Sequence, residues 1–270
     1  MINVAGGLVL LAAAVGCLLA AWRGLRGPAR RPLAVAGRVA AVTLVVTPLL
    51  AYGVWRLSKS RSFQFFGSLV QRVETAEPLV ALTFDDGPTP GHTEEVLALL
   101  RAQGVRATFF LIGKEVEANP TQARLIVADG HQVGNHTYSH ATMVAQSLPF
   151  THQEVERTDE LIRAAGYQGQ ILLCMPGCKR LFLLPLYLQQ TNRTTVIWDV
   201  EPESYPEVDA STERIAAHVL ERARPGSIIL LHVMYSSRAR TMAALPAIIE
   251  GLRAKGYRFV TVSELLAAGR

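Results

Sequence analysis

Acidic and imidazole side chains occur in three short stretches that could carry out metal-assisted chemistry. The stretch LTFDDGPTP contains the adjacent acids Asp85 and Asp86, and GNHTYSH contains His136 and His140. The histidines are four residues apart, so a single helical turn would place both on one face, a spacing that suits a divalent metal bound through imidazole. Adjacent acids must point apart, so they can serve two different roles. His232, in SIILLH, is a further candidate.

Each of these signals also has an ordinary explanation. An Asp-Asp-Gly-Pro sequence is most often a solvated turn, and a histidine pair at this spacing is most often part of a helix surface. Only the combination of the three stretches is a specific sign of a functional site, because each stretch follows or ends a strand-like run. In parallel α/β folds, functional residues collect at the carboxyl ends of the strands.

The chain past residue 62 alternates strand-like and helical patterns. Thr151 and Glu154 have the spacing of a capping box, which would start one of the helices. Alternation of this kind predicts a parallel sheet, and because nearly every strand is apolar we expect a distorted (β/α)7-type barrel. The predicted strands are 79–84, 106–112, 132–135, 171–175, 195–200, 227–233 and 258–262, and the predicted helices are 93–103, 119–130, 151–166, 211–224 and 240–255.

Four motifs give the chain a resemblance to a known family. LTFDDGPTP, GVRATFFLIG, GNHTYSH and SIILLH resemble the polysaccharide deacetylases, carbohydrate esterase family four, over roughly residues 73–267. The resemblance implies a distorted barrel and a divalent metal, most often Zn2+. It also implies removal of acetyl groups from N-acetylated sugars, as in peptidoglycan or chitooligosaccharides, or of O-acetyl groups from some polysaccharides.

The resemblance assigns a role to each matching residue. Asp85 matches the catalytic base, which takes a proton from the attacking water, and His232 matches the acid that protonates the leaving amine. Leu230 matches the leucine that lines the pocket for the acetate methyl group. The residues that match the metal ligands are Asp86, His136 and His140.

The third family motif is altered in this chain. The run CMPGC places Cys174 where the family has an arginine that contacts the catalytic aspartate, and Cys178 where it has a glycine. Gly177 could still donate its backbone N–H to the developing oxyanion. Cys174 and Cys178 could form a disulfide, or contribute to a zinc site, but we favour two unpaired thiols without a chemical role.

The fourth family motif also departs from the pattern. Ser204 and Tyr205 stand where the family often has Asp-Trp, with Asp199, Glu201 and Glu203 nearby. The partner that orients His232 is therefore not assigned by the motif, and Asp199 is the first candidate. Trp198 and Tyr205 are expected to line the substrate pocket.

The first 61 residues form a separate region with a membrane-like composition. The runs 2–22 and 33–55 are predicted to cross a membrane as a helical hairpin, and 62–270 to form the catalytic domain. No positive charge precedes the first run, which argues against a cleaved signal peptide. A buried hairpin in a soluble protein is the other alternative. Counting Arg38, five arginines lie between the uncharged runs 2–22 and 39–55, against three positive charges directly after residue 55, which predicts a cytoplasmic loop and an external catalytic domain.

The charge distribution excludes a nucleic-acid partner. Residues 1–61 contain eight Lys and Arg and no acids, a charge of +8, whereas residues 62–270 contain 19 Lys and Arg and 22 acids, a charge of −3. The basic balance therefore belongs to the N-terminal region, and the predicted catalytic domain is mildly acidic.

These observations predict a membrane-anchored, metal-dependent deacetylase of an envelope glycan, facing the periplasm or the cell exterior. Two alternatives stay open. The altered third and fourth motifs fit a catalytically impaired member that binds metal and glycan, and the membrane runs fit an enzyme that acts on a lipid-linked sugar.

Overall fold

A computed structural model describes residues 32–269. The chain consists of two compact units, and the boundary between them lies between Lys59 and Ser60. The first unit contributes one described helix, α2 (Pro32–Ser58), which contains the predicted span 33–55. Nowhere in residues 32–269 is there a helix long and apolar enough to cross a membrane. The predicted span 2–22 lies outside the described residues.

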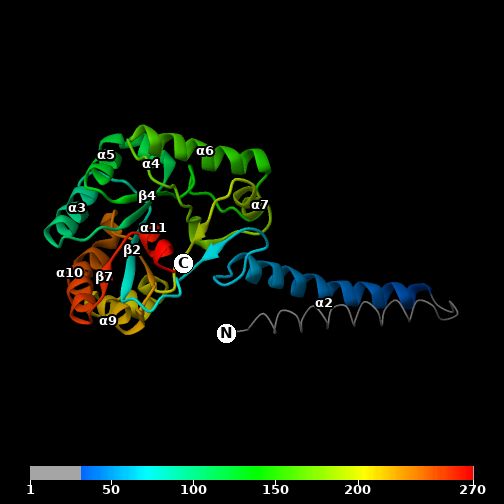
Figure 1. The fold of residues 1–270 in the computed structure, drawn as a ribbon. Helices are drawn as coiled ribbons and strands as arrows, with labels where there is room; N and C mark the ends of the chain where they lie inside the picture. Colours follow the sequence, from blue (N-terminus) through cyan, green and yellow to red (C-terminus); the bar gives the residue numbers. More distant parts are fainter. Residues whose placement is uncertain (1–31, 270) are drawn as a thin grey trace. The chain divides into compact units, whose positions relative to one another are not determined.

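The second unit is built on a parallel sheet with the strand order β4-β3-β2-β6, in which β7 also pairs with β2. The central strand β2 is buried at every position, because other strands pair with both of its edges and helices pack around it. Figure 1 shows these strands inside a ring of helices. The strands are β2 (Leu79–Asp85), β3 (Thr108–Leu111), β4 (Gln132–Asn135), β6 (Ile228–Leu231) and β7 (Arg258–Phe259).

The remaining strands form a separate two-stranded sheet of β1 (Leu69–Val70) and β5 (Thr195–Val196). The predicted strand 171–175 is not a strand. Only Leu173 takes part in sheet pairing, through single bridges to Asn135 and Thr195. The parallel α/β class is confirmed, but closure into a barrel is not, because isolated bridges rather than continuous ladders connect the two sheets.

The five predicted helices are all present with small shifts of their ends. They are α3 (His92–Ala102), α5 (Pro120–Ala128), α6 (Leu148–Ala164), α9 (Thr212–Arg222) and α10 (Ala239–Ala254). The predicted capping box at Thr151 is wrong. α6 begins one turn earlier, where Ser147 caps it by accepting a hydrogen bond from the Phe150 backbone N–H. The structure adds α4 (Gly113–Ala118), α7 (Leu183–Gln190), α8 (Pro206–Asp209) and α11 (Val262–Ala268), and the 3-10 turns Pro176–Cys178, Pro202–Ser204 and Ser236–Arg238.

Candidate metal and active site

The two adjacent acids stand at the carboxyl end of the central strand. Asp85 is the last residue of β2 and is 2% exposed. Asp86 follows with a φ of 73°, a left-handed conformation that aspartate tolerates better than most residues. Gly87 has a φ of 64°, which would strain any other residue, and a Cβ there would lie 2.8 Å from the Met234 sulfur, which would have to shift. The chain therefore turns sharply at the end of β2, and the carboxylates of Asp85 and Asp86 lie in different parts of the site.

The two histidines of GNHTYSH lie on an irregular loop after β4, not on a helical turn as expected. Thr137 and His140 have φ values of 63° and 59°, so the chain reverses within the loop. Asn135 accepts a hydrogen bond from the Thr137 N–H at 2.7 Å. Glu154 of α6 accepts two from Ser139, at 2.8 and 2.9 Å. These contacts fix the loop and bring the two imidazole centroids to 5.1 Å.

The predicted metal ligands are brought together. Asp86 Oδ1 lies 3.3 Å from His140 Nε2 and 3.6 Å from His136 Nε2, and the three donor atoms lie within 4.8 Å of one another. Asp86 Oδ1 is buried and has no hydrogen-bond partner among the described residues. Carboxylate and imidazole donors of this number fit a divalent metal that keeps positions open for other ligands.

A hydrogen bond sets the tautomer of His136. Its Nδ1–H donates to the Cys174 carbonyl oxygen at 2.8 Å, so the lone pair is on Nε2, which faces the two aspartates. Burial lowers the pKa of His136, which favours the neutral, metal-binding form. For Asp86, burial opposes ionisation, but the histidines, His140 first, outweigh it and lower its pKa to about 2. The Asp86 carboxylate raises the pKa of His140, so this imidazole must give up a proton when it binds a cation.

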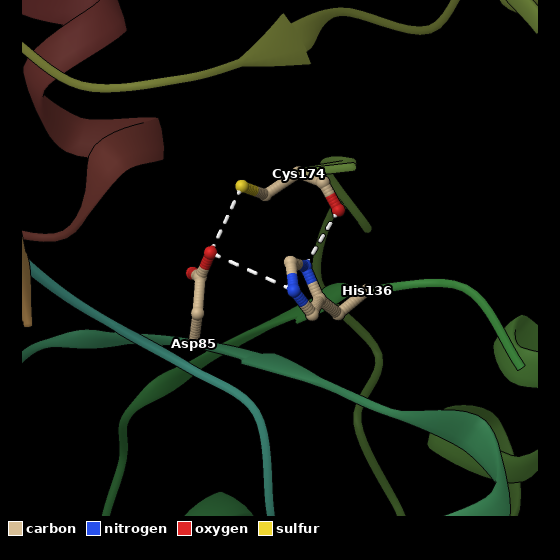
Figure 2. Close-up of side chains that lie close together, drawn as sticks. All are labelled: Asp85, His136 and Cys174. Carbon is tan, nitrogen blue, oxygen red and sulfur yellow. Dashed lines mark hydrogen bonds and ion pairs between the residues drawn. The ribbon is translucent and has the colours of Figure 1, made fainter. Parts of the chain in front are cut away.

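Asp85 lies next to this group and is more deeply buried than Asp86. Burial raises its pKa, against the opposing charges of His136 and His232. Its Oδ2 lies 3.7 Å from His136 Nε2 and accepts a hydrogen bond from the Cys174 thiol at 3.2 Å (Figure 2). Its Oδ1 is buried without a partner, and no lysine or arginine of residues 32–269 pairs with it. Asp85 is thus a buried carboxylate suited to accept a proton.

His232 follows β6 on the other side of Asp86, with its Nε2 at 4.0 Å from Asp86 Oδ2. Its Nδ1 pairs with the Glu203 carboxylate, which also accepts the His232 backbone N–H at 3.2 Å. Burial alone would lower the pKa of His232, but Glu203 raises it to about 9. The imidazolium form therefore persists at neutral pH and holds a proton at Nε2 for donation.

The predicted partner of His232 is wrong. Asp199 instead accepts hydrogen bonds from Ser227 Oγ at 2.9 Å and from the Ile228 backbone N–H at 3.0 Å, so it anchors the start of β6. Glu203 reaches His232 from the 3-10 turn Pro202–Ser204. Its carboxylate is held a second time by Thr241 Oγ1, at 2.6 Å. The spacing of residues in the sequence does not predict the Glu203–His232 pair, because the pair forms only when the 3-10 turn Pro202–Ser204 packs against the end of β6.

Known proteins match this chain over the same unit. Residues 72–194 match the polysaccharide deacetylase family. A peptidoglycan-N-acetylglucosamine deacetylase of Bacillus cereus is 34% identical over 200 residues, which cover 74% of this chain and 93% of that protein. A chitooligosaccharide deacetylase of Sinorhizobium fredii is 34% identical over 209 residues, covering 70% of this chain and 92% of its own length.

The chain belongs to the polysaccharide deacetylase family. Among solved structures, one similar to it is a mutant of a pseudoenzyme of this family from Bacillus anthracis, with restored enzymatic activity. The two share 27% identity and a TM-score of 0.67, over 74% of this chain and 71% of the other. The family therefore includes a pseudoenzyme, of which a mutant has restored enzymatic activity.

The altered third motif, CMPGC, supplies two cysteines to this part of the chain. Cys174 and Cys178 are both buried, free thiols, as expected. Burial raises the pKa of the Cys174 thiol well above its usual value, so the thiol is neutral. Arg180 does not replace the missing arginine, because its guanidinium donates to the Ser60, Phe63 and Cys178 carbonyl oxygens instead.

The predicted substrate-pocket residues have different environments. Leu230 and Trp198 are both buried in one apolar cluster that also contains Cys174, and the Trp198 indole N–H donates to Glu201 at 2.8 Å. Tyr205 is more exposed and its ring packs against His218 at 5.0 Å. The roles of these residues, and of the Gly177 N–H, stay predictions.

Proposed function

We propose that this chain is a metal-dependent deacetylase of N-acetylated glycans. The observation that supports this most strongly is the arrangement of three groups. The donors Asp86, His136 and His140 form one group, with the buried carboxylate of Asp85 on one side and the imidazolium of His232 on the other. Hydrolysis of an amide needs this combination, because the attacking water must lose a proton and the leaving amine must gain one.

The residues divide the chemistry as follows. Asp86, His136 and His140 would hold the metal, for which Zn2+ is our first choice, and a bound divalent ion activates water and polarises an amide carbonyl. Asp85 accepts the proton of the attacking water, a task suited to a carboxylate whose pKa is raised by burial. His232, kept protonated by Glu203, gives its Nε2 proton to the leaving nitrogen.

The substrate class is drawn from the relatives, which act on peptidoglycan and on chitooligosaccharides. Both contain β-linked N-acetylglucosamine units, so we propose this sugar as the unit recognised.

The proposal is tested by acetate release from N-acetylglucosamine oligomers and from peptidoglycan, after metal removal and reconstitution with Zn2+. We expect acetate release that is lost on chelation and recovered on adding metal. In the His136→Ala/His140→Ala variant, bound metal and acetate release should both be lost while the circular dichroism spectrum is kept. Undiminished metal stoichiometry in that folded variant would refute the ligand assignment.

A second candidate function has a specific observation in its favour. Asp85 has a cysteine thiol where the family has an arginine, and one structure similar to this chain is named a pseudoenzyme. A member of this kind would bind metal and glycan without turnover. Binding of both in the same preparation, with no acetate released at any pH, would favour it.

We further propose that residues 1–61 anchor the chain in a membrane and that the catalytic unit faces the periplasm or exterior. The uncharged run 2–22 and the arginines after it support the anchor. The external orientation follows from the charge count of the sequence with a second crossing at 33–55, for which no helix of residues 32–269 is long and apolar enough, so the orientation depends on the following test. A reporter fused after Arg270 should be active only if it is one that functions outside the cytoplasm. Activity of a cytoplasm-only reporter would reverse the orientation and favour a lipid-linked sugar as substrate.

A further inference from the structure

A second group of metal-binding side chains lies beside the first. Asp85, His136 and Cys174 each place one donor atom within 4.8 Å of the others, and all three are at most 2% exposed. The Cys174 sulfur lies 3.2 Å from Asp85 Oδ2, which lies 3.7 Å from His136 Nε2. Figure 2 shows the thiol, the carboxylate and the imidazole facing a common point.

These separations match those of ligands around one tetrahedral ion. Typical bond lengths are ~2.3 Å for Zn–S and ~2.0 Å for Zn–N and Zn–O. At tetrahedral angles, these bonds place a sulfur and an oxygen ligand ~3.5 Å apart and a nitrogen and an oxygen ligand ~3.3 Å apart. The backbone already fixes the group, because the Cys174 N–H donates to the Asn135 carbonyl oxygen at 3.0 Å and the Cys174 carbonyl accepts from His136 Nδ1. Little rearrangement would be needed to bind an ion.

The unpartnered oxygen of Asp85 is an independent sign of a missing cation. Asp85 Oδ1 is fully buried and has no hydrogen-bond partner in the described part of the chain, and Oδ2 receives only a weak thiol donor. Leaving a buried carboxylate without a compensating charge is costly. Cys178, in the same loop, contacts Arg180 and the Ser60 carbonyl oxygen instead, so it does not belong to this group.

We propose that Asp85, His136 and Cys174 form a second metal position that takes a strongly thiophilic divalent cation such as Cd2+. Binding replaces the thiol proton, which leaves to solvent, with a metal–sulfur bond. A thiolate, a carboxylate and a neutral imidazole then balance the two positive charges, as a buried site requires. The set with Asp86 and His140 has one carboxylate and no thiolate, so it favours harder ions.

The two positions exclude each other because both use His136 Nε2. Among the residues of the two groups, His140 is the most exposed, with a side chain that is 44% exposed. Occupation of the cysteine position uses Asp85 as a ligand and so removes the proposed base. Thiophilic ions should therefore act as inhibitors, and one ion, not two, should bind per chain.

The test uses cobalt as a spectroscopic probe and needs no activity measurement. Co2+ added to the metal-free full-length chain should produce a sulfur-to-cobalt charge-transfer band in the near ultraviolet. Cys174→Ala should lose the band and weaken Cd2+ binding by at least about tenfold, since loss of even an outer-shell partner has that effect. Cys178→Ala is the matched control and should keep both, and His140→Ala should keep the band.

Mn2+, which prefers oxygen and nitrogen donors, should bind Cys174→Ala and the parent equally, which shows that the variant is folded. The proposal is overturned if Co2+ binds the parent without a charge-transfer band, or if the band persists in Cys174→Ala. Because the readout is spectroscopic, a parent without deacetylase activity would refute the proposed function and leave this test intact.

Discussion

Glu203→Gln should lower the deacetylation rate by roughly a hundred- to ten-thousandfold, the range typical of general acid–base catalysis, whose upper end is reached when the carboxylate that orients a catalytic histidine is made neutral. Glu203 contacts His232 through both Nδ1 and the backbone N–H, so it fixes the ring and keeps it charged. Without the carboxylate, burial lowers the pKa of His232 from about 9. His232 then loses its proton at a lower pH and can no longer act as the acid.

The pH profile separates this role from a structural one. The acid form of His232 disappears as the pH rises through its pKa, so the basic limb of kcat should move to lower pH in Glu203→Gln. Glu203→Asp keeps the charge and should recover part of the rate with the limb near its original position. Asp199→Asn is the matched control, because Asp199 holds Ser227 and Ile228 rather than His232, and it should leave the limb unmoved. A profile that does not shift in Glu203→Gln would contradict the assignment.

The contrast between Glu203 and Asp199 shows what the sequence could and could not predict. Motif residues that end a strand were located correctly, because a strand fixes where its last side chains emerge and parallel strands end on the same edge of the sheet. Asp85 and Asp86 are of this kind. Glu203 belongs to a 3-10 turn, and its partner His232 is 29 residues away, so its position depends on packing that no local pattern records.

The same distinction explains the errors in the fold. The apolar run 171–175 has the composition of a strand, yet only Leu173 pairs, because the Cys174 carbonyl oxygen accepts from the His136 side chain rather than from a neighbouring strand. Ser147 caps α6 although Thr151 has the better capping-box spacing. Glu154, the residue that would complete the box, instead binds Ser139 and supports the histidine loop. Long-range contacts at the site outweighed local propensity in both places.

Restoring an arginine at position 174 should raise the deacetylation rate by roughly ten- to a thousandfold at neutral pH, the range typical of a positioned acid–base group. Cys174 Sγ already contacts Asp85 Oδ2, so a guanidinium from this position can pair with that carboxylate. A positive charge there lowers the pKa of Asp85, which burial now raises. The base is then ionised at lower pH, and the acidic limb of the profile should move down.

The backbone dihedral angles of the third motif determine which other family residues can be introduced there. Cys178 has a φ of 59°, so Cys178→Gly removes a strained conformation, whereas Gly177, at 57°, should stay glycine. The variant is therefore Cys174→Arg/Cys178→Gly. Cys174→Met/Cys178→Gly is its control, because it adds bulk to the same buried position without charge, and overpacking alone costs about 1–3 kcal/mol of stability. If the arginine variant folds like its control but gains no rate and no shift of the acidic limb, the missing arginine is not what limits this enzyme. If alkylation of the parent's cysteines also abolishes its activity, the thiols belong to the mechanism instead.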